Sequence, residues 1–290
     1  MNVEINDAAA WLKQLSKVNI PVLRQTARAL AKLEQDEDNL SARAITAVVL
    51  NDPFMVFKVL TYAQKNAGKR QLQDIVEVEA AILMMGTGAF YRNLAPDLLV
   101  DDRLKSDIPA LTHLLRLIKR AHRAAYYAAD WAALHKDLHS EEIWIAALLH
   151  DFAEMLMWCL APDKMNAIFD LQKKNKELRS KDAQEQVLGF HISDLQKELI
   201  RVYAMPPLLT QLMADDEGEN DEVKLDKRAT GVSLAVNLAR HSANGWDDAA
   251  LPDDYAAIAA FLHVDIESVL FLIGAPKPEL SKKDEDQPKE

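Results

Sequence analysis

Apolar residues recur along the chain every three or four positions, the spacing that places them on one face of an α-helix. A stripe over residues 23–33 predicts a helix that opens at Pro21, because proline is tolerated in a first helical turn. Ser41 is a residue of the N-cap type, and Asn51–Asp52–Pro53 combines a cap residue, an acid and a proline, so both predict further helix starts. Gly86–Thr87–Gly88 predicts the end of the next helix. The first third of the chain is therefore expected to be a series of short helices.

The longest helical stripe begins near Pro109 and keeps the helical period for several turns, which places His122 on the inward face. Ser140 is followed by two glutamates and predicts the start of another helix. That helix is nearly continuously apolar from Ile143 to Trp158. The His150–Asp151 pair lies in its middle, where ionisable side chains are costly to bury unless they have partners.

The last part of the chain predicts more helices, separated by polar segments. Helices are expected at 161–178, 191–202 and 225–243, and in two short pieces from Tyr255 onward. The segments 215–222 and 275–290 are rich in charge and have little to bury. We therefore expect an acidic solvated loop at the first and a disordered tail at the second.

The composition supports an all-α fold. The 290 residues are enough for one large domain or two modest ones, and 49 % of them are apolar. Only 8 residues are glycine, which costs roughly 1 kcal/mol relative to alanine inside a helix. The formal charge of −11, from 34 Lys and Arg against 45 Asp and Glu, argues against a nucleic-acid partner, because phosphate binding requires a concentrated basic face.

Compartment and membrane contact can also be addressed from the sequence. Cys159 is the single cysteine, so no disulfide can form within the chain, and its position at the end of an apolar helix predicts a small buried side chain. The N-terminal residues lack the basic-then-apolar layout of a signal peptide. No stretch approaches about 18 uninterrupted apolar residues, the length that spans a bilayer. We expect a cytoplasmic protein with no membrane contact.

The residues His122, His150 and Asp151 are candidate metal ligands. Antiparallel packing of the two successive helices that carry them can bring their side chains together. Imidazole suits transition metals, and a carboxylate lets the same site hold a harder ion. The alternative is a buried polar network, in which Asp151 accepts a hydrogen bond from an imidazole or from the backbone.

Several short motifs occur in an order that makes the pattern more specific. They are Asn51–Asp52–Pro53, Ala80–Ala81–Ile82, Arg92–Asn93–Leu94, His122 within KRAHRAAYYAA, AALLHD at 146–151, and Tyr203–Ala204–Met205–Pro206. From about residue 14 to 214 the chain resembles the HDOD family, the HD-related output domain of bacterial signalling proteins. This family is a divergent branch of the HD superfamily of metal-dependent phosphohydrolases.

The resemblance implies a particular domain organisation. An N-terminal helical half over 14–103 would pack on an HD-like half over 104–214, and the helices over 224–274 would complete the HD-like half. It also implies a regulatory and non-catalytic role, because the family commonly lacks part of the catalytic ligand set.

The sequence departs from the pattern of active HD enzymes in several places. Phe152–Ala153–Glu154 follows the pair where active enzymes often have Ile-Gly-Lys, so an anion replaces a cation. The next histidine position of the family falls on Ile192, and His191 misses it by one residue, which is about 100° of helical rotation. The aspartate expected on the 225–243 helix is absent, and Asn237 is the nearest polar residue. What remains is a partial or vestigial ligand set of His122, His150 and Asp151, too small to activate water.

We therefore expect a non-catalytic signal-transduction module that acts by binding and needs no cofactor. Its partner would be another signalling protein, a second copy of the chain, or a small ligand in the cleft between the two halves. The first alternative is a metal-dependent phosphohydrolase that acts on a nucleotide or cyclic dinucleotide with a divalent transition metal. The second is a small-ligand sensor that uses the vestigial cleft without chemistry. Gly-rich phosphate loops, Ser-His-Asp triads and paired CxxC motifs are absent from the sequence, so those reaction classes are set aside.

Overall fold

The computed structural model describes residues 8–15, 19–36, 38–66, 75–214 and 226–276. Within these ranges the chain folds into α-helices and one short 3-10 helix, and extended segments pair only at a single bridge between Val22 and Leu99. The predicted all-α fold is confirmed. The predicted acidic loop at 215–222 lies outside the described residues, as does the predicted tail apart from residues 275 and 276.

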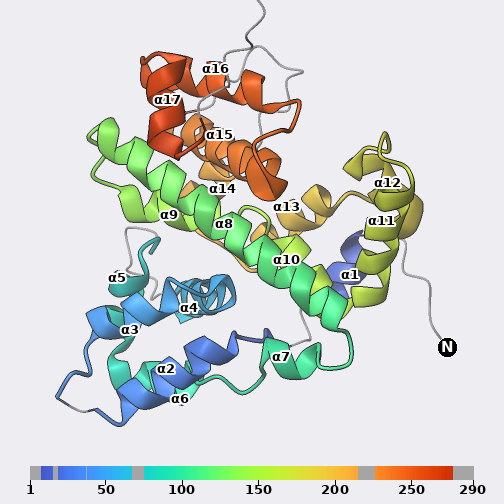
Figure 1. The fold of residues 1–290 in the computed structure, drawn as a ribbon. Helices are drawn as coiled ribbons and strands as arrows, with labels where there is room; N and C mark the ends of the chain where they lie inside the picture. Colours follow the sequence, from blue (N-terminus) through green and yellow to red (C-terminus); the bar gives the residue numbers. More distant parts are fainter. Residues whose placement is uncertain (1–7, 16–18, 37, 67–74, 215–225, 277–290) are drawn as a thin grey trace, which may run out of the picture.

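The N-terminal half is a group of short helices in the lower part of Figure 1. They are α2 (Arg24–Glu34), α3 (Ala42–Val49), α4 (Pro53–Asn66), α5 (Val78–Met85), α6 (Thr87–Leu94) and α7 (Val100–Arg103). The predicted start at Ser41 is confirmed, because its side chain accepts a hydrogen bond from the Ala44 amide of α3. Gly86 ends α5 with a φ of 78°, a conformation that favours glycine, and α6 begins at the next residue.

The HD-like half is organised around one long helix. Its helices are α8 (Ile108–Leu134), α9 (Ser140–Leu149), α10 (Phe152–Leu160), α11 (Pro162–Lys174), α12 (Ser180–Leu188), α13 (Ile192–Val202) and α14 (Pro207–Leu212). The long helix α8 crosses the molecule diagonally in Figure 1, with α9 alongside it, and it also packs against α10 and α11.

The C-terminal helices cover the upper end of α8 in Figure 1. They are α15 (Lys227–His241), the 3-10 helix η1 (Ser242–Asn244), α16 (Leu251–Leu262) and α17 (Ile266–Ile273). Helix α15 packs against both α8 and α9, so it belongs to the same packed core as the HD-like half. A Cβ atom at Gly231 would stand 3.0 Å from Cζ of Phe261, which explains how α16 can approach α15 so closely.

The first described helix, α1 (Ala8–Leu15), packs on α13 in the HD-like half. Figure 1 shows it apart from α2 to α6. Trp11 and Leu12 are buried in this contact region of the core. The domain boundary expected at residue 14 therefore falls inside α1. This helix precedes the N-terminal half in the sequence but packs on the HD-like half.

Aromatic side chains join the two halves. Phe152 at the start of α10 stacks on Phe57 of α4, with ring centroids 4.4 Å apart, and it also meets Phe54 at 5.6 Å. All three rings are fully buried. A hydrogen bond also joins the two halves: Glu141 of α9 accepts a hydrogen bond of 2.9 Å from the Val78 amide at the start of α5. The two halves therefore share one continuous core.

Asp52 is a completely buried carboxylate in the N-terminal half. One of its oxygens accepts hydrogen bonds from the Phe54 and Met55 amides at the start of α4, and the other accepts one of 2.8 Å from the Leu23 amide just before α2. Burial raises the pKa of Asp52 to about 6, although these hydrogen bonds favour the charged form. One side chain thus caps α4 and ties it to the start of α2.

The helical stretch Ser140–Leu160, which comprises α9 and α10, is long and apolar enough to cross a membrane. However, 78 % of its most apolar window is buried inside the protein, as expected of a core helix. The bent pair α16 and α17 passes the same test only if the two are counted as one span, with a bend of 101° between them.

Candidate functional site

The His150–Asp151 pair lies at a break between two helices. The single helix predicted over 143–158 is therefore corrected: α9 ends at Leu149, α10 begins at Phe152, and the pair forms the turn between them. The break leaves backbone groups without helical partners, and Gln196 of α13 satisfies two of them. Its amide nitrogen donates to the Leu149 carbonyl at 3.0 Å, and its amide oxygen accepts from the Ala153 amide at 2.6 Å.

Both carboxylate oxygens of Asp151 are held by arginine. Nη2 of Arg120, from α8, donates to Oδ2 at 2.7 Å, and Nη2 of Arg240, from α15, donates to Oδ1 at 3.2 Å. Nδ1 of His150 lies 3.1 Å from the same Oδ1. Burial raises the pKa of Asp151, but the positive charges of Arg240 and Arg120 outweigh it and hold that pKa well below its usual range. Asp151 is therefore an ionised carboxylate between two guanidinium groups.

Glu154 extends this network by one helical turn. Its Oε2 lies 3.3 Å from Nη2 of Arg120, the same nitrogen that binds Asp151. Burial raises the pKa of Glu154, and the nearby charge of Asp151 raises it further, against the opposing effect of Arg120. The anion that replaces a cation in the sequence after the pair therefore has a structural role: it shares Arg120 with Asp151.

His122 is engaged by the N-terminal half. Its Nε2 lies 3.1 Å from the Asn51 carbonyl oxygen, in the turn between α3 and α4. A carbonyl oxygen only accepts hydrogen bonds, so this nitrogen carries the proton and donates it. Burial lowers the pKa of His122, which favours the neutral ring. The ring nitrogen that faces Asn51 is thus occupied in a contact between the two halves.

The residues present do not fit a resident metal ion. Nε2 of His122 is a hydrogen-bond donor, and the guanidinium groups of Arg120 and Arg240 at the two oxygens of Asp151 place positive charge where a cation would have to bind. Across the part of the chain that the structure describes, no group of three or more His, Cys, Asp and Glu side chains could hold a metal ion. The assignment of His122, His150 and Asp151 to a vestigial metal site stays a prediction.

Two other histidines lie away from this network. His191 is the N-cap residue of α13, whereas the sequence pattern predicted it inside the helix. Its Nε2 lies 3.7 Å from Oε2 of Glu185. His241 occupies the last turn of α15, where its Nδ1 lies 2.7 Å from Oδ2 of Asp254 on α16.

The Arg120–Asp151 pair lies in a large groove of about 1560 Å³. Its walls come from α8 and α15 on one side and from α11, α12 and α13 on the other, with His150 and Asp151 between them. His122 lines the same groove. All three predicted site residues therefore face one cavity, of a size that accommodates a small ligand.

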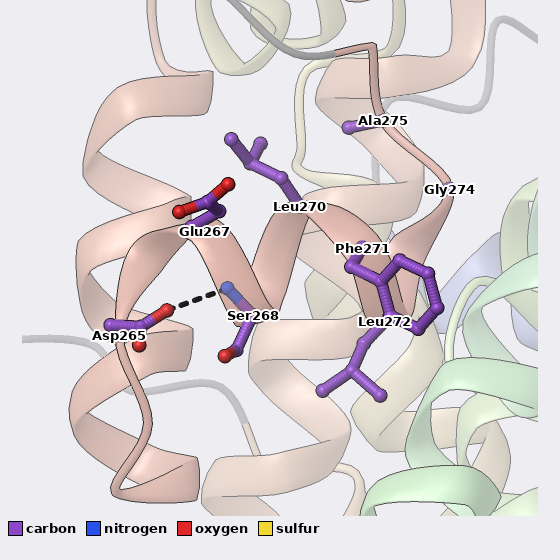
Figure 2. Close-up of a pocket in the computed structure, with 8 residues that line it drawn as sticks. All are labelled: Asp265, Glu267, Ser268, Leu270, Phe271, Leu272, Gly274 and Ala275. Carbon is purple, nitrogen blue, oxygen red and sulfur yellow. Dashed lines mark hydrogen bonds between the residues drawn. The ribbon is translucent and has the colours of Figure 1, made fainter.

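A second hollow, of about 750 Å³, lies on the outside of α17 and is drawn in Figure 2. Asp265 accepts a hydrogen bond of 2.7 Å from the Ser268 amide and so caps the helix. Phe271 is 87 % exposed, and Figure 2 shows it beside Leu272. This hollow is a shallow apolar surface built from one helix and its ends, without a network like that of Asp151.

Three residues that shape the site were missed by the sequence interpretation: Arg120, Gln196 and Arg240. Arg120 stands two positions before His122 on the same long helix, and this proximity in the sequence is a signal for a cation near the pair. Arg240 is three residues after Asn237, on the helix where the family pattern has an aspartate. Its guanidinium also donates to Asn237 at 3.3 Å. No sequence signal indicated that this helix would supply a cation to Asp151.

The His122–Asn51 contact makes a testable contribution to stability. The His122→Phe variant loses the donor, so we expect the free energy of unfolding to fall by about 1 kcal/mol. The lowered pKa of His122 means that its contribution is present above the ordinary histidine pKa and is lost as the pH falls. The wild-type chain should therefore lose more stability than the variant between about pH 7.5 and about pH 5.5. Urea unfolding at both values measures this, and equal losses in the two proteins would contradict it.

Most of the chain is similar in fold to solved structures of bacterial proteins. It matches the MmoQ response regulator from Methylococcus capsulatus str. Bath with a TM-score of 0.65 and 18 % identity, over 89 % of this chain and 98 % of that one. A virulence factor from Campylobacter jejuni subsp. jejuni matches with a TM-score of 0.66 and 16 % identity, over 92 % and 97 % of the two chains. At these identities the likeness shows a shared fold.

The sequence itself carries the family assignment. A comparison with curated proteins gives no match. The family model of the HDOD domain matches residues 20–218, which is more than half of the chain. This range includes α2 to α14 and the His150–Asp151 break, and the resemblance seen in the motifs is confirmed. The chain therefore belongs to the HDOD family.

Proposed function

We propose that this protein is a non-catalytic regulatory module that acts by binding. The observation that carries the proposal is the pairing of Asp151 with Arg120 and Arg240. Two fixed guanidinium groups neutralise the carboxylate that an HD hydrolase would use for a metal ion. A hydrolase of this type needs a bound metal ion that activates a water, and the positive charge of the two guanidinium groups at Asp151 opposes the binding of a cation there.

The source of Arg240 strengthens the argument. Helix α15 is the element on which the family's late metal-binding aspartate was expected, and it supplies a cation in that region instead. An arginine is always protonated, so it cannot become a ligand at any physiological pH. Helix α15 therefore does more than lack a metal-binding carboxylate, because it supplies a positive charge in its place.

A role in signalling is supported by one of the structural neighbours, which is described as a response regulator. In this proposal the module receives and passes on information by association with another protein, with a second copy of itself, or with a small ligand. The groove beside Asp151 is the concave surface available for the last of these.

Metal analysis and hydrolysis assays test the proposal. Protein purified without chelator should contain far less than one equivalent of Mn, Fe, Ni or Zn, and added Mn²⁺ should leave its melting temperature unchanged, because Asp151 is already neutralised. It should not turn over bis(p-nitrophenyl) phosphate in the presence of Mn²⁺. A stoichiometric metal, together with turnover that is lost in a folded His150→Ala or Asp151→Ala variant, would overturn the proposal and establish the phosphohydrolase alternative.

A further inference from the structure

The groove beside Asp151 is strongly cationic although the chain as a whole carries a net charge of −11. Seven of its lining residues are Lys or Arg, and two are Asp or Glu. Both acids, Asp151 and Glu154, are already paired with Arg120. Among the described residues, no further acidic side chain lines the groove.

Three of the cations have no acidic partner within the described part of the chain. Arg116 and Lys119 project from α8, and Lys181 lies in the first turn of α12 on the opposite wall. None of the ion pairs or side-chain hydrogen bonds formed by described residues includes them. These three cations mark what we call the outer part of the groove, and they place positive charge on both of its walls.

Aromatic rings lie next to these cations. His113, one helical turn before Arg116, stacks on Trp158 with ring centroids 5.0 Å apart and an interplanar angle of 17°. It also meets Phe169 of α11 at 4.2 Å. Phe169 is 41 % exposed, so its ring is available on the groove wall. A planar ring can stack on such a surface, and cations beside it can bind an attached phosphate.

We propose that the outer part of this groove binds a small phosphorylated compound that carries a planar ring, of the nucleotide class. The ring stacks against Phe169, whose own ring packs on His113, and the phosphate binds Arg116 and Lys181. The inference rests on the proposed function, since it names the ligand that a regulatory module of this kind would sense. Asp151 stays paired with its arginines and takes no part in the contact.

The charge of the rest of the protein favours a small ligand over a polymer. Electrostatic interactions are screened over about 8 Å at physiological salt, so a compound inside the groove is influenced mainly by the cations beside it. A nucleic acid or an acidic protein would extend beyond the groove onto a surface whose overall charge is negative, and would be repelled there.

Binding measurements on the full chain test the proposal. The probes are AMP and GMP, with adenosine and inorganic phosphate as the two separate halves of such a ligand. Binding is followed by calorimetry and by intrinsic tryptophan fluorescence, to which Trp158 contributes. We expect each nucleotide to bind at least about tenfold more tightly than adenosine or phosphate alone, because only the nucleotide engages both the rings and the cations. Affinity should fall as salt is raised.

Matched variants localise the site. Arg116→Gln combined with Lys181→Gln should weaken nucleotide binding at least about tenfold, and Phe169→Ala should weaken both the nucleotide and adenosine. Lys174→Gln on α11 and Phe271→Ala on α17 change residues of the same types that do not line the groove, and both should bind like wild type.

Three results would overturn the ligand assignment. They are nucleotide affinity no greater than that of inorganic phosphate, equal affinity in the groove variants and the wild type, and binding of a single-stranded oligonucleotide without binding of either mononucleotide. Each of these leaves the non-catalytic proposal standing, because that proposal depends on metal content and hydrolysis. Conversely, metal-dependent hydrolysis of bound AMP would overturn the proposed function and leave the nucleotide site in place.

Discussion

Replacing Asp52 by alanine is expected to lower the free energy of unfolding by about 3 to 5 kcal/mol at about pH 5. The buried amides of Leu23, Phe54 and Met55 lose their acceptor in this variant, and each unsatisfied buried group costs about 1 to 3 kcal/mol. Urea or thermal unfolding measures the loss. Asp38→Ala, at an exposed position nearby, is the control and should change stability by no more than about 0.5 kcal/mol.

The effect of Asp52 should depend on pH in a definite direction. Its pKa of about 6 in the folded protein lies above the value of 3.8 for the free side chain. A raised pKa means that the contribution to stability is fully present below pH 3.8 and is lost as the pH rises through about 6. The wild type should therefore lose up to about 3 kcal/mol from this group between about pH 4 and about pH 7, and Asp52→Asn should not. A variant curve parallel to the wild type would show that Asp52 is not the titrating group.

The second large effect is expected for Arg120→Ala, at about 3 kcal/mol of lost stability near pH 8. Arg120 is largely buried and holds Asp151 and Glu154 together, so its removal leaves two neighbouring carboxylates with only Arg240 to offset them. Arg116→Ala is a matched control one turn away on α8, because Arg116 is exposed and pairs with no acid among the described residues. It should leave stability within about 0.5 kcal/mol of wild type.

The pH dependence separates the Arg120 network from simple packing. Glu154 already has a raised pKa, and the loss of Arg120 removes the main charge that lowers it. A raised carboxyl pKa stabilises the folded state at low pH and loses this effect as the pH rises. The deficit of Arg120→Ala relative to wild type should therefore shrink from about pH 8 to about pH 5. A deficit that is the same at both values would mean that Arg120 acts through the packing of its side chain.

Much of the fold could be predicted from local patterns. The helix starts at Ser41 and at Asp52–Pro53 follow from capping chemistry, and α8 follows from its long apolar stripe, because these signals depend on neighbouring residues alone. The break at His150–Asp151 could not be predicted in this way. The residues around it are apolar and suited to helix, and the break is satisfied by Gln196, which lies 43 residues after Ala153.

The sequence predicted which three residues lie together at the candidate site, but not the arginines that contact Asp151. His122, His150 and Asp151 do line one groove, as the order of the helices suggested. The cations that complete the site come from α8 and α15, and Arg240 is 89 residues away from its partner. Helical periodicity indicates which face of a helix is buried, but not which side chain of a distant helix it will meet. The sequence pattern therefore could not indicate that arginines from two other helices would contact the Asp151 carboxylate.

The position of α15 has a practical consequence for the borders of the folding unit. The family match ends at residue 218, whereas Arg240 and the helix surface that packs on α8 come later in the chain. Likewise, α1 precedes the residues matched by the family model and packs against α13. A shortened protein cut at the limits of the family match would expose apolar surface on α8 and α13 and release the Asp151 carboxylate from one of its two guanidinium groups. Any metal affinity measured on such a fragment would be a property created by the cut.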